Sequence, residues 1–117
     1  MSNIKRINVG ERMSQVVIYN GLVFTAGQVA SSAPNKDVGE QTKNVLDKID
    51  NLLKEAGTNK SNLISANIWL SNINDFSNMN IIWDAWIDKN NPPVRACVES
   101  KLASDKFNVE ISVIAKV

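Results

Sequence analysis

The chain has 117 residues, of which 44% are hydrophobic and 21% charged, and its formal net charge is +1. These values fit one globular domain over residues 1–117 and exclude a disordered chain, since a typical domain holds about 100–150 residues. The near-neutral charge gives no reason to expect nucleic acid or an anionic membrane surface as the main partner.

The first segment, residues 1–6, has no apolar run after its basic residues and is therefore unlike a signal peptide. No later apolar stretch approaches the roughly 20 residues that span a bilayer. We expect a cytoplasmic protein without a membrane anchor.

Two β-rich runs, residues 16–19 and 22–26, flank the dipeptide Asn20-Gly21. Asn-Gly readily takes the positive φ angles of a type I′ turn and is the strongest short-range signal of a hairpin. We therefore predict a β-hairpin that ends at Gly27, followed by a Ser/Pro-containing loop over residues 30–35.

Between residues 38 and 56 the apolar side chains recur with the 3.6-residue period of a helix, and Gly57 is a suitable stop. The pattern predicts a helix with one buried stripe. That stripe comprises Val45, Leu46, Ile49, Leu52, Leu53 and Ala56, while Glu40, Lys43, Asp47, Lys48 and Lys54 are expected on the solvent side.

Residues 63–70 alternate and predict a strand. We expect Ile64, Ala66, Ile68 and Leu70 on its core face and Leu63, Ser65, Asn67 and Trp69 on the other. The second face is semi-polar with one large aromatic, which suits a contact between subunits.

A second helix is expected after an N-cap at Asn74 or Asp75, and the Asn-Asn-Pro-Pro of residues 90–93 should end it. Its apolar positions are Phe76, Met79, Ile82, Trp83 and Trp86. Residues 94–98 and 109–115 read as the last strands. Two helices segregated from five or six strands predict an α+β sandwich, one mixed sheet under a helical layer, whose uncovered face favours self-association.

The available chemistry is narrowed by the absence of histidine and by the single cysteine, Cys97. One cysteine cannot form an internal disulfide, which suits a reducing compartment. A zinc site would lack soft ligands, and Ser-His-Asp or Cys-His catalysis would lack its base. We expect neither a metal nor a cofactor.

Arg95 is the most informative residue, because an arginine inside a short apolar strand needs a partner. By alternation Arg95, Cys97 and Glu99 share one face. If the last two strands share a sheet, Glu110 can lie on that face. Two interpretations remain open. The local pattern favours an ion pair between the strands, whereas a functional site needs Arg95 turned to a ligand and Glu110 to a water.

Two further residues have ordinary explanations. Cys97, with no imidazole to activate it, is expected to fill the core or to form a wall of a pocket. Asn80 is a polar helix-surface residue unless it lines a ligand cleft.

Residues 93–98, then Lys101 and Ala103, and then residues 109–111 resemble the C-terminal signature of a known family, the Rid (YjgF-like) family. Residues 14–24 resemble its hairpin, residues 26–28 its Ser-Gly-Gln turn, and residues 74–80 the start of its second helix. Arg12 and the Trp-Asp-Ala-Trp of residues 83–86 are closest to the YoaB-like branch.

The resemblance implies a chorismate-mutase-like fold, assembled as a homotrimer around a central β-barrel with clefts between neighbouring chains. It also implies hydrolysis of reactive enamines and imines, such as aminoacrylate released by pyridoxal-phosphate enzymes, to a keto acid and ammonia. Arg95 would clamp the substrate carboxylate. Glu110 and the backbone carbonyl of Cys97 would position the water, Gly27 would offer backbone contacts and Asn80 would line the cleft.

Two positions depart from the family pattern. Met13 stands where the family usually has Tyr, and Ala26 replaces the Ser of its Ser-Gly-Gln turn. Each change removes a hydroxyl near the substrate, and one lost hydrogen bond costs about 0.5–1.5 kcal/mol. These changes favour an alternative, a protein that binds a keto acid as sensor or regulator without turnover. A ribonuclease or translation inhibitor ranks last, because histidine is absent and the charge is near neutral.

Overall fold

The computed structural model describes residues 3–117. Met1 and Ser2, part of the segment compared with a signal peptide, lie outside the described residues. The elements in chain order are β1 (Lys5–Val9), β2 (Ser14–Tyr19), β3 (Leu22–Thr25), β4 (Gln28–Val29), α1 (Val38–Glu55), η1 (Lys60–Asn62), β5 (Leu63–Leu70), η2 (Ile73–Asp75), α2 (Phe76–Trp86), β6 (Val94–Glu99) and β7 (Val109–Lys116).

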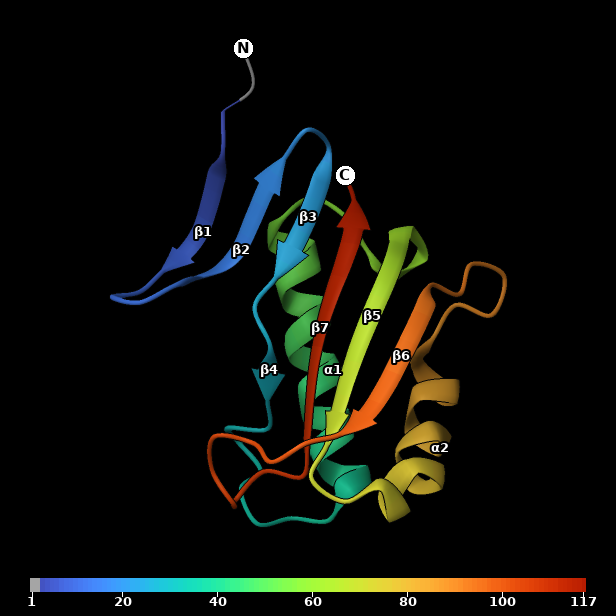
Figure 1. Ribbon diagram of the computed structural model, residues 1–117. Coiled ribbons are helices and arrows are strands. Elements are labelled where there is room, and N and C mark those ends of the chain that lie inside the picture. Colours follow the sequence, from blue (N-terminus) through green and yellow to red (C-terminus); the bar gives the residue numbers. More distant parts are fainter. Residues whose placement is uncertain (1–2) are drawn as a thin grey trace.

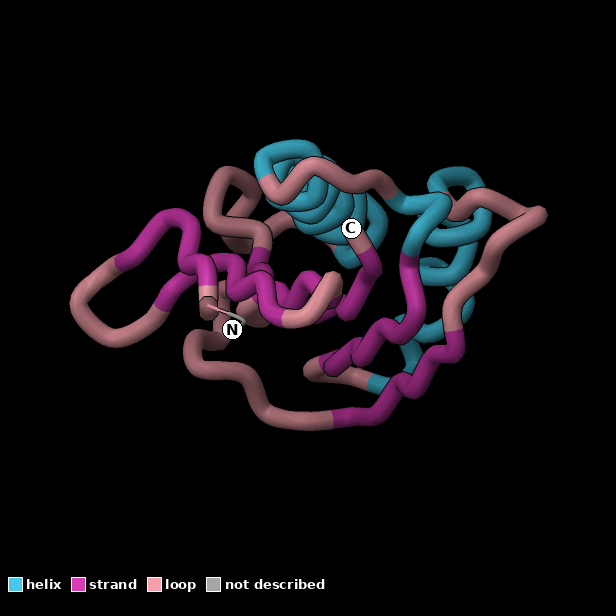
Figure 2. Tube along the Cα trace, turned by 90° about the horizontal axis from the view of Figure 1, so that it is seen from above, coloured by secondary structure: helices cyan, strands magenta, loops and turns pink. Residues whose placement is uncertain are grey.

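The strands form a single mixed sheet in the order β1-β2-β3-β7-β5-β6, and the short β4 also pairs with β7. Of the strands within residues 3–117, only β5 and β6 run parallel; the other paired strands are antiparallel. Both helices cover one face of the sheet and leave the other uncovered (Figures 1 and 2). The predicted α+β architecture is confirmed, with β1 and β4 as strands that the sequence pattern did not reveal.

Turn chemistry explains two boundaries that were predicted correctly. Asn20 and Gly21 have φ angles of 52° and 76°, as a type I′ turn requires. Gly57, with φ of 82°, ends α1 in the left-handed conformation that glycine tolerates best. The amide of Thr58 then donates to the carbonyl of Leu53 at 2.9 Å, which satisfies a carbonyl at the end of the helix.

The core lies between α1 and the sheet, and three side chains differ from the predicted pattern. On β5, Ile64 is 44% exposed whereas Leu63 is 7% exposed, the reverse of the expectation. The pairing with β7 is irregular between Leu63 and Ser65, and this irregularity shifts the alternation at the start of the strand. On α1, Lys48 is half-buried and hydrogen-bonded rather than solvated.

The start and end of α2 also differ in detail from the prediction. Asp75 is the N-cap, but its side chain makes no capping hydrogen bond. Asn72 instead accepts from the amide of Asn74 at 2.9 Å and stabilises η2, which leads into the helix. The helix ends at Trp86, before the Asn-Asn-Pro-Pro segment, because Ile87 is already extended. None of the helices within residues 3–117 is both long and apolar enough to cross a bilayer.

Candidate functional site

Arg95 lies on the edge strand β6, and α2 holds its side chain. It pairs with Ala66 of β5, which is 1% exposed, so Arg95 is on the helix-covered face of the sheet. Its Nη1 donates to Oδ1 of Asn80 at 2.8 Å. The guanidinium carbon lies 5.3 Å from the ring centroid of Trp83 and 5.7 Å from that of Phe76. One hydrogen bond and two cation–π contacts therefore fix the guanidinium.

The arrangement leaves most of the hydrogen-bonding capacity of Arg95 unused. A guanidinium carries five N–H donors, and among residues 3–117 its side chain makes one hydrogen bond and no ion pair. Trp83 is 5% exposed and forms a rigid wall, whereas Phe76 is 40% exposed at the rim. A planar donor group that is held in place but has no anion suits the two-point binding of a carboxylate.

Glu110 does not share the face of Arg95, so that prediction is wrong. On β7 the neighbouring Ile111 is 0% exposed in the core, and Glu110 points the other way, paired with Trp69 of β5. The reason is the strand between them. On β5, Ala66 pairs with Arg95 and Trp69 pairs with Glu110. Ala66 and Trp69 are an odd number of residues apart, so their side chains, and those of their partners, point to opposite faces of the sheet. An ion pair of Arg95 and Glu110 within one chain is excluded for the same reason.

Glu110 instead packs against the turn between β3 and β4. A Cβ atom built on Gly27 would overlap the carboxylate of Glu110, with the carboxyl carbon at 2.9 Å, so a side chain at this position would force the Glu110 carboxylate to move. Gln28 is 4% exposed and donates to the carbonyl of Ala26 at 3.0 Å and to Oε1 of Gln15 at 2.8 Å. These bonds hold the turn that carries Ala26 and Gly27 beside Glu110.

Met13 belongs to the loop between β1 and β2 and is 56% exposed. It lies two residues before Gln15, whose carbonyl accepts from the amide of Ala26 at 2.9 Å. The described chain therefore holds two separate groups of candidate residues. We call Arg95, Asn80 and Cys97 the arginine group, and Ala26, Gly27 and Glu110 the glutamate group; Met13 belongs to neither.

Cys97 is half-buried on the same strand as Arg95 and packs against the core. Burial raises the pKa of its thiol, and the nearby charge of Arg95 offsets this only in part. The thiol is therefore protonated at neutral pH, which argues against a nucleophilic role.

Sequence reasoning missed the aromatic contacts of Arg95. Phe76 and Trp83 were named only as apolar positions of the second helix, although with Asn80 they follow the spacing i, i+4, i+7 along one stripe of α2. Nothing local in the sequence shows that this stripe meets β6. That information comes only from the topology, since the two elements are joined by residues 87–93.

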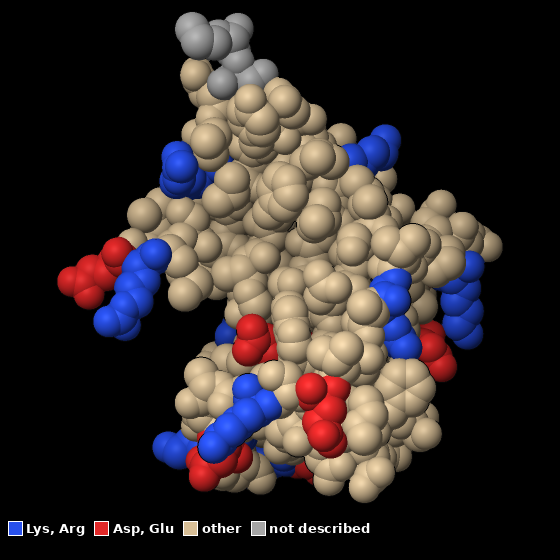
Figure 3. Space-filling model, in the orientation of Figure 1, with Lys and Arg blue, Asp and Glu red and all other residues tan. Residues whose placement is uncertain are grey.

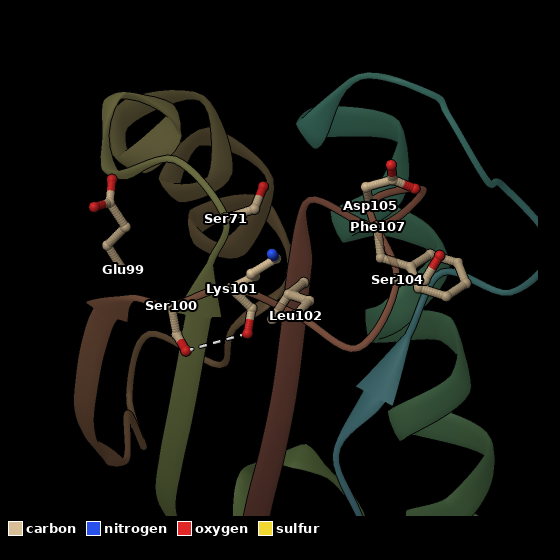
Figure 4. A pocket seen from close by; sticks show the side chains of 8 residues that line it. All are labelled: Ser71, Glu99, Ser100, Lys101, Leu102, Ser104, Asp105 and Phe107. Carbon is tan, nitrogen blue, oxygen red and sulfur yellow. Dashed lines mark hydrogen bonds between the residues drawn. The ribbon is translucent and has the colours of Figure 1, made fainter.

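A cavity of about 570 Å³ lies elsewhere and contains none of the predicted site residues. It is lined by the chain between β6 and β7, which crosses the end of β5 (Figure 1). Figure 4 shows Glu99 and Asp105 at opposite ends of it, with Lys101 between them. Oε2 of Glu99 accepts a hydrogen bond from the backbone amide of Ile73 at 2.9 Å. Among residues 3–117 no group of His, Cys, Asp or Glu side chains is arranged to hold a metal ion.

A mixed sheet with two helices on one face, and an arginine on its edge strand, defines a small α+β protein. The chain belongs to the Ribonuc_L-PSP family, described as Endoribonuclease L-PSP, which matches residues 3–117 and comprises the YjgF or Rid proteins. The resemblance noted in the sequence is thereby confirmed.

Curated relatives and solved structures agree with this assignment. A RutC family protein of Haemophilus influenzae is 46% identical over 112 residues, covering 96% of this chain and 97% of its own. The RutC family protein YoaB of Escherichia coli K12 is 40% identical, covering 97% of this chain and 98% of its own, which supports the YoaB-like branch. A crystal structure of a YjgF family member from Neisseria meningitidis has a TM-score of 0.91 at 38% identity, covering 97% of this chain and 94% of its own.

Proposed function

We propose that the protein hydrolyses reactive enamines and α-imino acids of the aminoacrylate type to keto acids and ammonia. The observation that carries the proposal is the guanidinium of Arg95. It is fixed by Asn80 and two aromatic rings, and its remaining donors suit the carboxylate of a small substrate. Membership of the Rid family supports the same chemistry.

We further propose that the working site lies between two copies of the chain in a homotrimer. Within one chain the arginine group and the glutamate group face opposite sides of the sheet, so a single substrate can meet both only if they come from different copies. The uncovered face favours association, since Val94, Val98 and Phe24 on it are 70%, 51% and 36% exposed. Charged side chains are also sparse over the middle of this face (Figure 3).

In the proposed mechanism the protein orients the reactants and supplies a fixed electrostatic field. Arg95 binds the carboxylate, and the backbone of Gly27 contacts the substrate. Glu110 and the carbonyl of Cys97 hold a water against the protonated imine carbon. The water oxygen forms a bond to that carbon, and its protons pass to nitrogen. The carbon–nitrogen bond then breaks, which leaves a keto acid and an ammonium ion, the protonated form of ammonia.

The test couples the protein to an amino-acid dehydratase that releases an imine, and follows keto-acid formation above the spontaneous rate. We expect the wild type to accelerate the reaction and Arg95→Ala to lose most of the acceleration. Lys43→Ala is a suitable control, because Lys43 is an exposed cation on α1. Equal rates for the wild type and Arg95→Ala would refute the catalytic role.

A second candidate is a protein that binds keto acids without turnover. It is favoured by Ala26 and by the exposed Met13, which place no hydroxyl where the family usually has one. Calorimetry would decide between the two. Arg95-dependent binding of 2-oxobutanoate without any imine hydrolysis would support the binding protein, whereas turnover would support the deaminase.

A further inference from the structure

A second cavity lies on the helix side of the turn that carries Gly27. It measures about 340 Å³ and opens between α1 and the chain around β2 and β4. Its lining contains no residue of the arginine or glutamate group. The lining residues are Gln15, Gln28, Lys48, Asn51 and Leu52.

Among residues 3–117 the cation in this lining, Lys48, has no anionic partner. Nζ of Lys48 donates to the carbonyl of Val29 and to Oγ of Ser31, both at 2.8 Å. An ammonium group has three donors, so one remains. Burial is the sole cause that lowers the pKa of Lys48, and no carboxylate raises it. Lys43 and Lys54 on the same helix are exposed, so Lys48 is the lysine of α1 that is withdrawn from solvent.

The amides in the lining add further donors. Both hydrogens of Gln28 Nε2 are used, one by Oε1 of Gln15 at 2.8 Å and one by the carbonyl of Ala26 at 3.0 Å. Because the oxygen of Gln15 accepts from Gln28, the free end of Gln15 is its NH₂ group. Lys48 and Gln15 therefore present donors to one cavity that no carboxylate lines.

We propose that this cavity is a binding site for a small carboxylate anion, with Lys48 and Gln15 as its donors. The site is linked to the turn beside Glu110, since Lys48 holds the carbonyl of Val29 and Gln28 holds that of Ala26. An anion that draws Lys48 or Gln15 toward itself loosens those bonds and shifts the turn. The binding site does not depend on imine hydrolysis and is testable without it.

The experiment titrates sodium propionate into uniformly ¹⁵N-labelled protein and follows the side-chain amide signals of Gln15, Gln28 and Asn51. Sodium chloride at equal ionic strength is the blank. We expect saturable shifts in the wild type and also in Arg95→Ala, because Arg95 is absent from this cavity. Lys48→Met should weaken binding at least tenfold, and the exposed Lys43→Met should leave it unchanged.

Gln15→Glu is the decisive variant if Lys48→Met fails to fold. It keeps an oxygen that accepts from Gln28 but replaces the donor with a negative charge, so propionate binding should be abolished while the spectrum stays dispersed. The proposal is overturned if these amides do not shift in the wild type, if the shifts persist in Gln15→Glu, or if Arg95→Ala removes them. The last result would place the propionate in the cleft of Arg95 instead.

Discussion

The hydrogen bond from Arg95 to Asn80 separates a binding role of the guanidinium from a structural one. Asn80→Leu removes the acceptor, whereas Asn80→Asp keeps an oxygen in place and adds a negative charge 2.8 Å from Nη1. If Arg95 only stabilises the packing of α2 on β6, the aspartate is harmless or favourable. If Arg95 binds a carboxylate, the aspartate competes with the ligand.

The two variants differ in expected magnitude. A hydrogen bond to a charged group contributes about 1.5–3 kcal/mol, and at this half-buried position we take the lower end, which predicts a roughly tenfold weaker Kd for Asn80→Leu. Two carboxylates on opposite edges of one guanidinium lie about 6 Å apart and repel by about 2.8 kcal/mol at an effective dielectric constant of about 20. Asn80→Asp should therefore weaken binding roughly a hundredfold.

The assay is calorimetric titration with 2-oxobutanoate, combined with thermal unfolding of each variant. We expect affinity to fall in the order wild type, Asn80→Leu, Asn80→Asp, while the unfolding temperature of Asn80→Asp stays at or above that of Asn80→Leu. Binding by Asn80→Asp that equals or exceeds that of Asn80→Leu would show that Arg95 does not meet the ligand carboxylate.

Three other changes have defined outcomes. Gly27→Ala should displace the carboxylate of Glu110 and lower kcat/KM at least tenfold. The free energy of unfolding should fall by no more than the roughly 1–3 kcal/mol of an overpacked site. Unchanged turnover would contradict this prediction. The thiol of Cys97, its pKa raised by burial, should react with Ellman's reagent more slowly than free cysteine at pH 7, and more slowly still in Arg95→Ala, which removes the charge that lowers that pKa. Hydrogen bonds from neighbouring side chains hold the pKa of Asp88 below its ordinary 3.8. The ionised carboxylate therefore stabilises the folded protein fully above about pH 4, and this stabilisation is lost as the pH falls through the lowered pKa. In urea unfolding, Asp88→Asn should reduce the loss of unfolding free energy at acid pH, and an unchanged loss would contradict this prediction.

Local signals predicted most of the fold because they act within a few residues. The backbone preferences of Asn20-Gly21 favour a hairpin turn at that position. The apolar stripe that precedes Gly57 predicts α1 without reference to other elements. β1 was missed because Lys5–Val9 buries little of its surface, so its sequence shows no clear amphipathic contrast. Ile64 was misplaced because alternation cannot reveal an irregular register.

The candidate site was harder to predict because its geometry depends on pairs of elements. Alternation correctly showed which neighbours share a side within β6 and within β7. It did not show that β5 lies between these strands and sets Arg95 and Glu110 on opposite faces. The aromatic contacts of Arg95 depend likewise on how α2 packs beside β6. Non-local register, rather than residue chemistry, limited the sequence analysis.

Subunit complementation tests the central claim most directly, since the claim assigns Arg95 and Glu110 of one site to different copies. Arg95→Ala and Glu110→Gln are each expected to be inactive alone. When the two variants are unfolded together in equal amounts and refolded, random assembly of a cyclic trimer gives intact pairings at about a quarter of the sites. We predict recovery of about a quarter of the wild-type rate. A mixture as inactive as its components would contradict a site shared between copies.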